Sequence, residues 1–106
     1  MNLEKELQLV TFEQERLLRK LGFDYSPISH KPTVALALQY LEDVMGVYGC
    51  VMYVWSGEDI TFMINFTAKG LGIRIGDNTE YKTRREADSV LLTLILKYLI
   101  KQKRGE

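Results

Sequence analysis

The chain has 106 residues, of which 46% are hydrophobic and 26% are charged. This length and composition predict one soluble globular domain over residues 1–106, because two well-buried domains need a longer chain. Fourteen basic residues balance fourteen acidic ones, so the chain lacks the excess of Lys and Arg typical of a general polyanion binder. Zero net charge also weakens the protection against self-association, which favours an oligomer.

Few residues offer metal or redox chemistry. Cys50 is the only cysteine, so no intramolecular disulfide forms, as is typical of a reducing cytosol. His30 is the only histidine, and no further metal ligands flank it, so we interpret it as a solvated loop residue and expect no metal and no cofactor. The N-terminus has acidic residues and no long apolar core, and the apolar runs are shorter than a membrane span. We therefore expect a cytoplasmic protein without membrane association.

The N-terminal segment is predicted to hold one short helix and a linker. Thr11 and Gln14 have the spacing of a capping box, which predicts a helix from Phe12 to Leu21. Gly22 follows at the position of a left-handed C-terminal stop. The stretch from Asp24 to Lys31 contains turn-forming residues and a proline, which favour an extended linker. This segment is too small to build a core of its own.

Two parts of the chain are distinguished by this pattern. Residues 1–31 supply the helix and linker, and residues 32–104 are predicted to form an α-β-β-β-α core. Thr33 caps the first core helix, which runs from Val34 to Met45 with apolar side chains at helical spacing. Gly46 ends that helix.

Three strands are predicted next. Val47 to Trp55 is nearly all apolar, which favours a strand covered on both faces. Ile60 to Thr67 alternates, and Leu71 to Ile75 alternates again. The short turns between them imply a three-stranded antiparallel meander. The side chains expected to face the helices from the middle strand are Ile60, Phe62, Ile64 and Phe66.

The last helix is the most constraining element. Thr83 and Glu86 form a capping box, and the residues from Leu91 to Leu99 cover an apolar arc of roughly 200°, against the roughly 100° of a surface helix. Such a helix must contact the sheet, the second helix and one further surface, either the N-terminal helix or a partner subunit. The predicted class is therefore α+β, with both long helices packed on one face of the sheet.

Several segments resemble small uncharacterised proteins of gut-bacterial phages and mobile elements. The segments are TFEQERLLRKLGF (Thr11 to Phe23), KPTVALALQYLEDVMGVY (Lys31 to Tyr48), an aromatic strand pair containing Trp55, and a Tyr–spacer–Glu-Ala helix start from Tyr81 to Ala87. The likeness covers most of the chain, but its motifs are caps, stops and core positions. It implies a phage or mobile-element origin and an accessory role, and it assigns no residue a function.

The element order from Thr33 onward is also similar to that of double-stranded RNA-binding domains. In that family the last helix begins with K-K-x-A-K, and Arg84 and Arg85 match the two basic positions. Asp88 replaces the final lysine, and the first loop between strands contains Glu58 and Asp59, which phosphates repel. The resemblance implies RNA contacts through Arg84 and Arg85 as an alternative function, for which basic groups are needed at both ends of the module.

The sheet face turned away from the helices is the best candidate site. If the alternating apolar residues of the middle strand face the helices, other side chains of the sheet face away, and aromatic, Met and Arg side chains are typical of binding hot spots. Coverage of this face by the N-terminal segment is the competing interpretation. The candidate residues are Tyr53, Trp55, Met63, Asn65 and Arg74.

These observations favour a small non-enzymatic interaction protein with a protein partner of unknown identity, which self-associates as a homodimer. The RNA-binding module is the second hypothesis. An enzyme is the third, since the adjacent acids Glu42-Asp43 and Glu58-Asp59 lie on a wet helix face and in a turn. No nucleophile–base pair or metal cluster accompanies them in the sequence.

Overall fold

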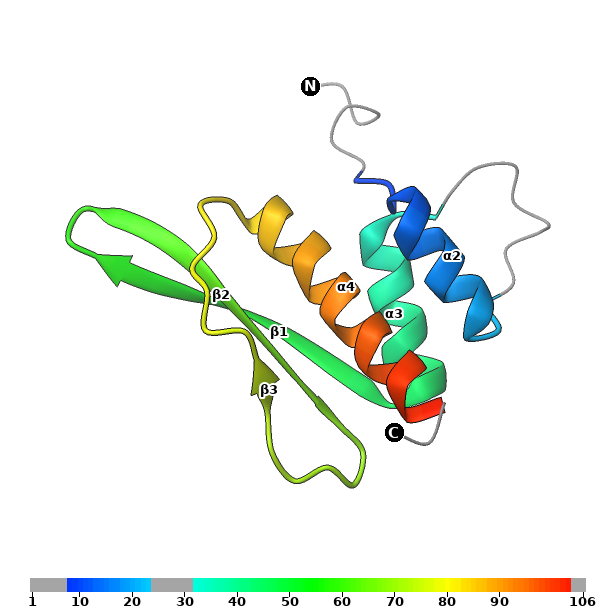
Figure 1. Cartoon of the computed structure of the whole chain (residues 1–106). Helices are drawn as coiled ribbons and strands as arrows, with labels where there is room; N and C mark the ends of the chain where they lie inside the picture. Colours follow the sequence, from blue (N-terminus) through cyan, green and yellow to red (C-terminus); the bar gives the residue numbers. More distant parts are fainter. Residues whose placement is uncertain (1–7, 24–31, 104–106) are drawn as a thin grey trace.

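The computed structural model describes residues 8–23 and 32–103, so the predicted linker and His30 lie outside the described residues. The described part holds helices on one side of a small sheet, whose first two strands extend away from the helices (Figure 1). The elements follow the order α2 (Phe12–Lys20), α3 (Val34–Met45), β1 (Val47–Ser56), β2 (Asp59–Ala68), β3 (Ile75–Gly76) and α4 (Arg84–Lys103). The predicted α+β class and element order are confirmed.

Helix α2 begins at the predicted residue and ends one residue earlier than predicted, with Leu21 as its C-cap. The Gln14 N–H donates to Thr11 Oγ1 over 3.1 Å, and the Thr11 N–H donates to Gln14 Oε1 over 2.9 Å, which completes the capping box. Gly22 has a φ of 90°, and the Phe23 N–H donates to Leu18 O over 3.0 Å. This left-handed stop satisfies a carbonyl that the helix end leaves open.

Helix α3 also has the predicted bounds and both predicted caps. Thr33 Oγ1 accepts the Leu36 N–H over 3.1 Å, and Gly46 adopts a φ of 67° in the left-handed region. Strand β1 starts at the next residue, Val47. Gly46 is thus the only residue between helix and strand, so α3 ends and β1 begins at the same corner of the molecule.

The sheet has the order β1-β2-β3 and is antiparallel throughout. Strands β1 and β2 pair along ten residues, from Val47 opposite Ala68 to Ser56 opposite Asp59. The third strand is shorter than the predicted Leu71–Ile75, since only Ile75 and Gly76 pair with β2. The alternation of apolar residues from Leu71 to Ile75 therefore predicted too long a strand. Gly72 adopts a φ of 74° and bends the chain out of strand geometry.

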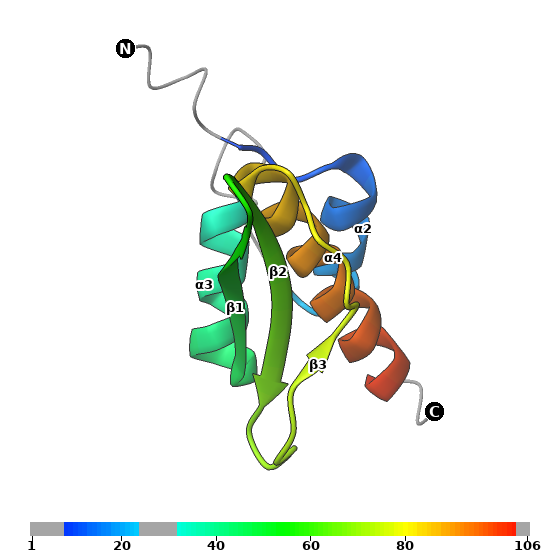
Figure 2. The ribbon, with the colours of Figure 1, turned by 90° about the vertical axis from the view of Figure 1, so that its left-hand side faces the viewer.

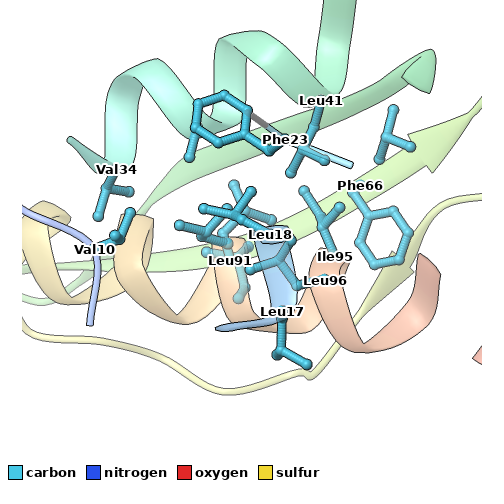
Figure 3. Close-up of a cluster of buried hydrophobic side chains, with 14 of the residues drawn as sticks. Val10, Leu17, Leu18, Phe23, Val34, Leu41, Phe66, Leu91, Ile95 and Leu96 are labelled. Atoms are coloured by element: carbon cyan, nitrogen blue, oxygen red, sulfur yellow. The ribbon is translucent and has the colours of Figure 1, made fainter. Parts of the chain in front are cut away.

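The core forms around α4, as its apolar arc predicts. Leu91, Leu92, Ile95 and Leu96 are fully buried, and α4 contacts β1, β2, α3 and α2 (Figure 3). Burying each of these side chains stabilises the fold by about 1.5–3 kcal/mol. The third surface that the sequence demanded is therefore α2 of the same chain.

Helix α2 is held on α4 by a buried glutamine. Gln14 is only 2% exposed, and its side-chain amide donates to Ser89 O over 2.9 Å and to Thr93 Oγ1 over 2.8 Å. Ser89 and Thr93 lie four residues apart on α4, so they form a polar stripe on one side of that helix. Part of that stripe is thus a helix–helix contact with satisfied polar groups.

Candidate functional site

Strand β1 is much longer than the helix beside it. The 12 residues of α3 span about 18 Å at 1.5 Å per residue, whereas the 10 residues of β1 span roughly 33 Å. Because α3 ends and β1 begins on either side of Gly46, and the two elements diverge from there, the outer part of β1 and its partner β2 extend past α3 (Figure 1). We call this outer part, residues 52–63, the hairpin arm, and we call residues 47–51 with 64–68 the inner half.

The hairpin arm carries an apolar patch on the same side of the sheet as the helices. Trp55 lies opposite Ile60 and Tyr53 lies opposite Phe62, and the Tyr53 and Phe62 rings have centroids 5.5 Å apart. Tyr53 is 64% exposed and Trp55 is 70% exposed. We call these four residues the arm patch.

A hollow opens at the end of the hairpin arm beside this patch. It has a volume of about 340 Å³ and is lined by Asp59, Ile60, Thr61 and Lys82. Its lining combines an apolar side chain with one acid and one base.

The predicted set of five site residues does not share one face. Residues directly opposite each other in an antiparallel pair have side chains on the same face, so Tyr53 and Trp55 lie on the helix side with Phe62 and Ile60. Met63 and Asn65 alternate with those residues along β2 and face away from the helices. The prediction that Tyr53 and Trp55 lie on the far face is therefore wrong.

The far face brings together the other three predicted residues. The Asn65 amide donates to Met52 Sδ over 3.6 Å, and Arg74 Nη1 donates to Asn65 Oδ1 over 2.9 Å. Met63 lies opposite Met52 in the register. This face is a flat surface of mixed character, on which the Arg74 cation is held by an amide.

Nothing in residues 8–23 or 32–103 covers this far face. The described N-terminal helix α2 packs on α4 instead, and the helices all lie on one side of the sheet (Figure 2). Tyr48 and Met52 of β1 are exposed there. Within the described residues, β1 is therefore covered on one face only, and the described part of the N-terminal segment does not cover the other face.

Arg84 and Arg85, the two arginines of the RNA-binding alternative, lie in different surroundings. Arg84 lines a cleft of about 320 Å³ between α3 and α4, together with the acids Glu42 and Asp88. Burial raises the pKa of the Asp88 carboxyl, and the Arg84 charge acts in the opposite direction. The carbonyl of Arg85 accepts the side-chain amide of Gln8 over 2.6 Å. Two acids therefore offset the Arg84 cation, which does not favour phosphate binding.

The described residues contain neither a cluster of metal-binding side chains nor a helix that could span a membrane. No three or more of their His, Cys, Asp and Glu side chains are grouped so as to bind a metal ion. None of the helices in this part of the chain has the length and apolar character needed to cross a bilayer.

Comparison of the chain with family models, with curated proteins and with solved structures gives no match. Function is therefore inferred from the surface itself. The register confirms that Ile60 and Phe62 face the helix side, as the sequence predicts, and Phe62 packs against the core. What the sequence interpretation missed is that Ile60, on the same face, is 39% exposed and belongs to the arm patch. The signal was present in the sequence, since the predicted strand Val47–Trp55 is longer in ångströms than the predicted helix that ends at Gly46.

Proposed function

We propose that this chain is a small non-enzymatic protein-interaction protein that self-associates as a homodimer through the hairpin arm. One observation carries the proposal: Tyr53 and Trp55 are mostly exposed on the sheet face that forms the core only a few residues away. Trp and Tyr are the side chains most enriched at the centres of protein interfaces. An exposed cluster of this kind is typical of a contact surface.

The charge distribution favours a protein partner over a nucleic acid. The net charge is zero, and Arg84 lies in a cleft with two acids. A second copy of the chain meets no long-range repulsion at neutral net charge. The proposed partner is therefore the chain itself, in the cytoplasm.

The resemblance of the Thr11–Phe23 and Lys31–Tyr48 segments to phage and mobile-element proteins supports an accessory role in such an element. In that setting, the homodimer binds a further protein of the host or of its defence. The identity of that protein is not encoded in any motif of the chain.

The proposal is tested by the mass of the full chain in solution. We expect light scattering to give twice the monomer mass of 12.3 kDa. Trp55→Ala truncates the largest exposed side chain of the arm patch and is expected to weaken the dimer by about 2 kcal/mol or more, roughly 30-fold in the dissociation constant. Circular dichroism should show that the variant keeps its fold, because the side chain is not part of the core.

Ile73→Ala is the matched control. Ile73 is 63% exposed and apolar but lies in the loop before β3, outside the hairpin arm. Its truncation should leave the dimer unchanged. A wild-type mass that stays at 12.3 kDa at every concentration contradicts the proposal, and so does an equal loss of affinity in the two variants.

A further inference from the structure

We infer that two copies join by pairing the free edges of their β1 strands, antiparallel about Tyr53, so that the two sheets become one. This inference rests on the proposed self-association and adds the atoms that make the contact. The occupant of the edge is a second copy of the same strand.

Strand β1 is an unprotected edge. It stands at the end of the order β1-β2-β3, so no described strand pairs with its other side. Its ten residues, VYGCVMYVWS, contain no charged residue and no proline, and its register with β2 runs without a bulge. Proteins usually block long edges with lysines, prolines or bulges, because an open edge is a template for another strand.

The backbone groups that the edge presents follow from printed hydrogen bonds. Phe62 exchanges both of its backbone bonds with Tyr81, each over 2.8 Å, so its N–H and C=O point away from β1. Tyr53 lies opposite Phe62 and thus forms the kind of pair in which both residues direct these groups outward. By alternation, Val51 and Trp55 do the same. The outward donors and acceptors therefore belong to the residues beside and within the arm patch.

The position of α3 selects the part of the edge that is accessible. Helix α3 contacts β1, and the two elements diverge from the corner where they join, so the outer part of β1 extends clear of the helix (Figure 1). A two-fold axis at Tyr53 lets the arms of both copies overlap while the two α3 helices stay clear of each other. This register pairs Tyr53 with the partner's Tyr53, and Val51 with the partner's Trp55.

The side chains brought together by this register are apolar on both copies. Trp55 packs beside an aliphatic residue, and the two Tyr53 rings become neighbours, an arrangement that stabilises antiparallel pairs. Burial of a Tyr or Trp side chain removes roughly 150–250 Å² from water. Because Tyr53 and Trp55 are 64% and 70% exposed in the single chain, they supply at most about a quarter to two fifths of the roughly 800 Å² per partner of a standard interface. Val51, Met52 and Val54 add to this area from the same strand.

Cross-linking by cysteine tests the register directly. In a Cys50→Ser background, we expect Tyr53→Cys to form a covalent dimer on mild oxidation, because residues exchanging both hydrogen bonds have Cα atoms about 5.5 Å apart, within disulfide range. The control is Ile73→Cys in the same background, since Ile73 has nearly the same exposure as Tyr53. Equal cross-linking of the two variants overturns the inference, because it reports random collision.

Proline substitution tests the edge itself. The N–H of Tyr53 points away from β2, so Tyr53→Pro removes an outward donor and leaves the bonds of the hairpin in place. We expect Tyr53→Pro to lose the dimer at concentrations where the wild type is dimeric, and Tyr53→Ala, which keeps the donor, to lose less. If Tyr53→Pro fails to fold, the cysteine experiment still decides.

The outcomes separate this inference from the proposed function. A wild-type dimer that neither cross-links through Tyr53→Cys nor responds to Tyr53→Pro overturns the edge pairing and leaves self-association standing. A wild-type monomer at every concentration overturns both. A dimer that cross-links at Tyr53→Cys and not at Ile73→Cys establishes the edge and its register together.

Discussion

The inner half and the hairpin arm are the same two strands in opposite surroundings. Both alternate side chains in the same way, and both are rich in aromatic and aliphatic residues. In the inner half, Val47 is 2% exposed and Phe66 is completely buried, whereas Trp55 in the arm is 70% exposed. Composition therefore does not decide which part of a strand is buried. The reach of the helices that cover it decides.

Glycine at position 49 shows how closely the helix layer approaches the inner half. A Cβ atom placed on Gly49 would lie 2.8 Å from Leu91 Cδ2 and 3.4 Å from Ile95 Cδ1. The end of the Leu91 side chain must therefore shift to admit a Cβ atom at this position. The arm has no such constraint, because its helix-side residues are the large rings of Tyr53 and Trp55. Close packing at one end and open aromatic surface at the other divide the hairpin into a structural part and a contact part.

The largest expected effect contrasts one aromatic residue from each region. Phe66→Ala removes a buried ring that packs against Tyr98, with centroids 5.2 Å apart, and should lower the free energy of unfolding by about 3–5 kcal/mol. Tyr53→Ala removes an exposed ring from the same face and should change it by about 0.5 kcal/mol or less. Denaturant unfolding of both variants measures the difference.

The measurement belongs at the lowest workable protein concentration, because a dimer adds concentration-dependent stability. Leu96→Ala serves as a second buried control with an expected loss of about 2–5 kcal/mol. If Tyr53→Ala destabilises the dilute protein as much as Phe66→Ala, the arm is part of the core and the comparison fails.

A smaller effect is expected from filling the close contact in the inner half. Gly49→Val forces side-chain atoms into Leu91 and Ile95, both buried on α4, and should destabilise the fold by about 1–3 kcal/mol. Gly49→Ala should fall between Gly49→Val and the wild type. Thermal unfolding gives the order. If Gly49→Val is as stable as the wild type, α4 moves away from β1 at little cost. The helices would then cover the inner half no more tightly than the arm.

Much of the fold follows from local signals that act over a few residues. The caps at Thr11 and Thr33 and the stops at Gly22 and Gly46 set the helix ends, and the apolar arc of α4 demands several walls. These features depend on hydrogen bonds and side-chain spacing within single elements. The short length of β3 could not be predicted from these local signals, because the left-handed conformation of Gly72 is one of several that glycine adopts freely.

The sequence predicts the kinds of residue in the candidate site, but it assigns Tyr53 and Trp55 to the wrong face of the sheet. The alternation along β2 correctly separated Phe62 from Met63, but the face of β1 was assigned without a register. The two-residue turn at Gly57 and Glu58 places Trp55 opposite Ile60, which puts Tyr53 and Trp55 on the helix side. The sequence does not predict that α2 docks on α4 through Gln14. A buried glutamine is recognised only from its hydrogen-bond partners, and Ser89 and Thr93 are far away in the sequence.

The smallest effect concerns Tyr81, which marks the boundary between the two regions. Its backbone pairs with Phe62, and its hydroxyl donates to the Asp77 carboxylate. Burial, followed by this bond, raises the pKa of the Tyr81 hydroxyl above its ordinary value of 10.0. The fold thus favours the protonated form, and its contribution to stability is complete below pH 10 and is lost as the pH rises through the folded-state pKa. Tyr81→Phe removes the bond and should cost about 0.5–1.5 kcal/mol at neutral pH.

The expected signature is the pH dependence of that difference. The wild type should lose its advantage over Tyr81→Phe as the pH rises above 10, because the unfolded chain then releases the phenolic proton before the folded one does. Urea unfolding of both proteins across this range measures it, with Tyr53→Phe in the exposed arm as the control. An advantage that persists or grows at high pH would show that the Asp77 bond does not hold the proton. Tyr81 would then be held at the base of the arm only by its two backbone hydrogen bonds with Phe62.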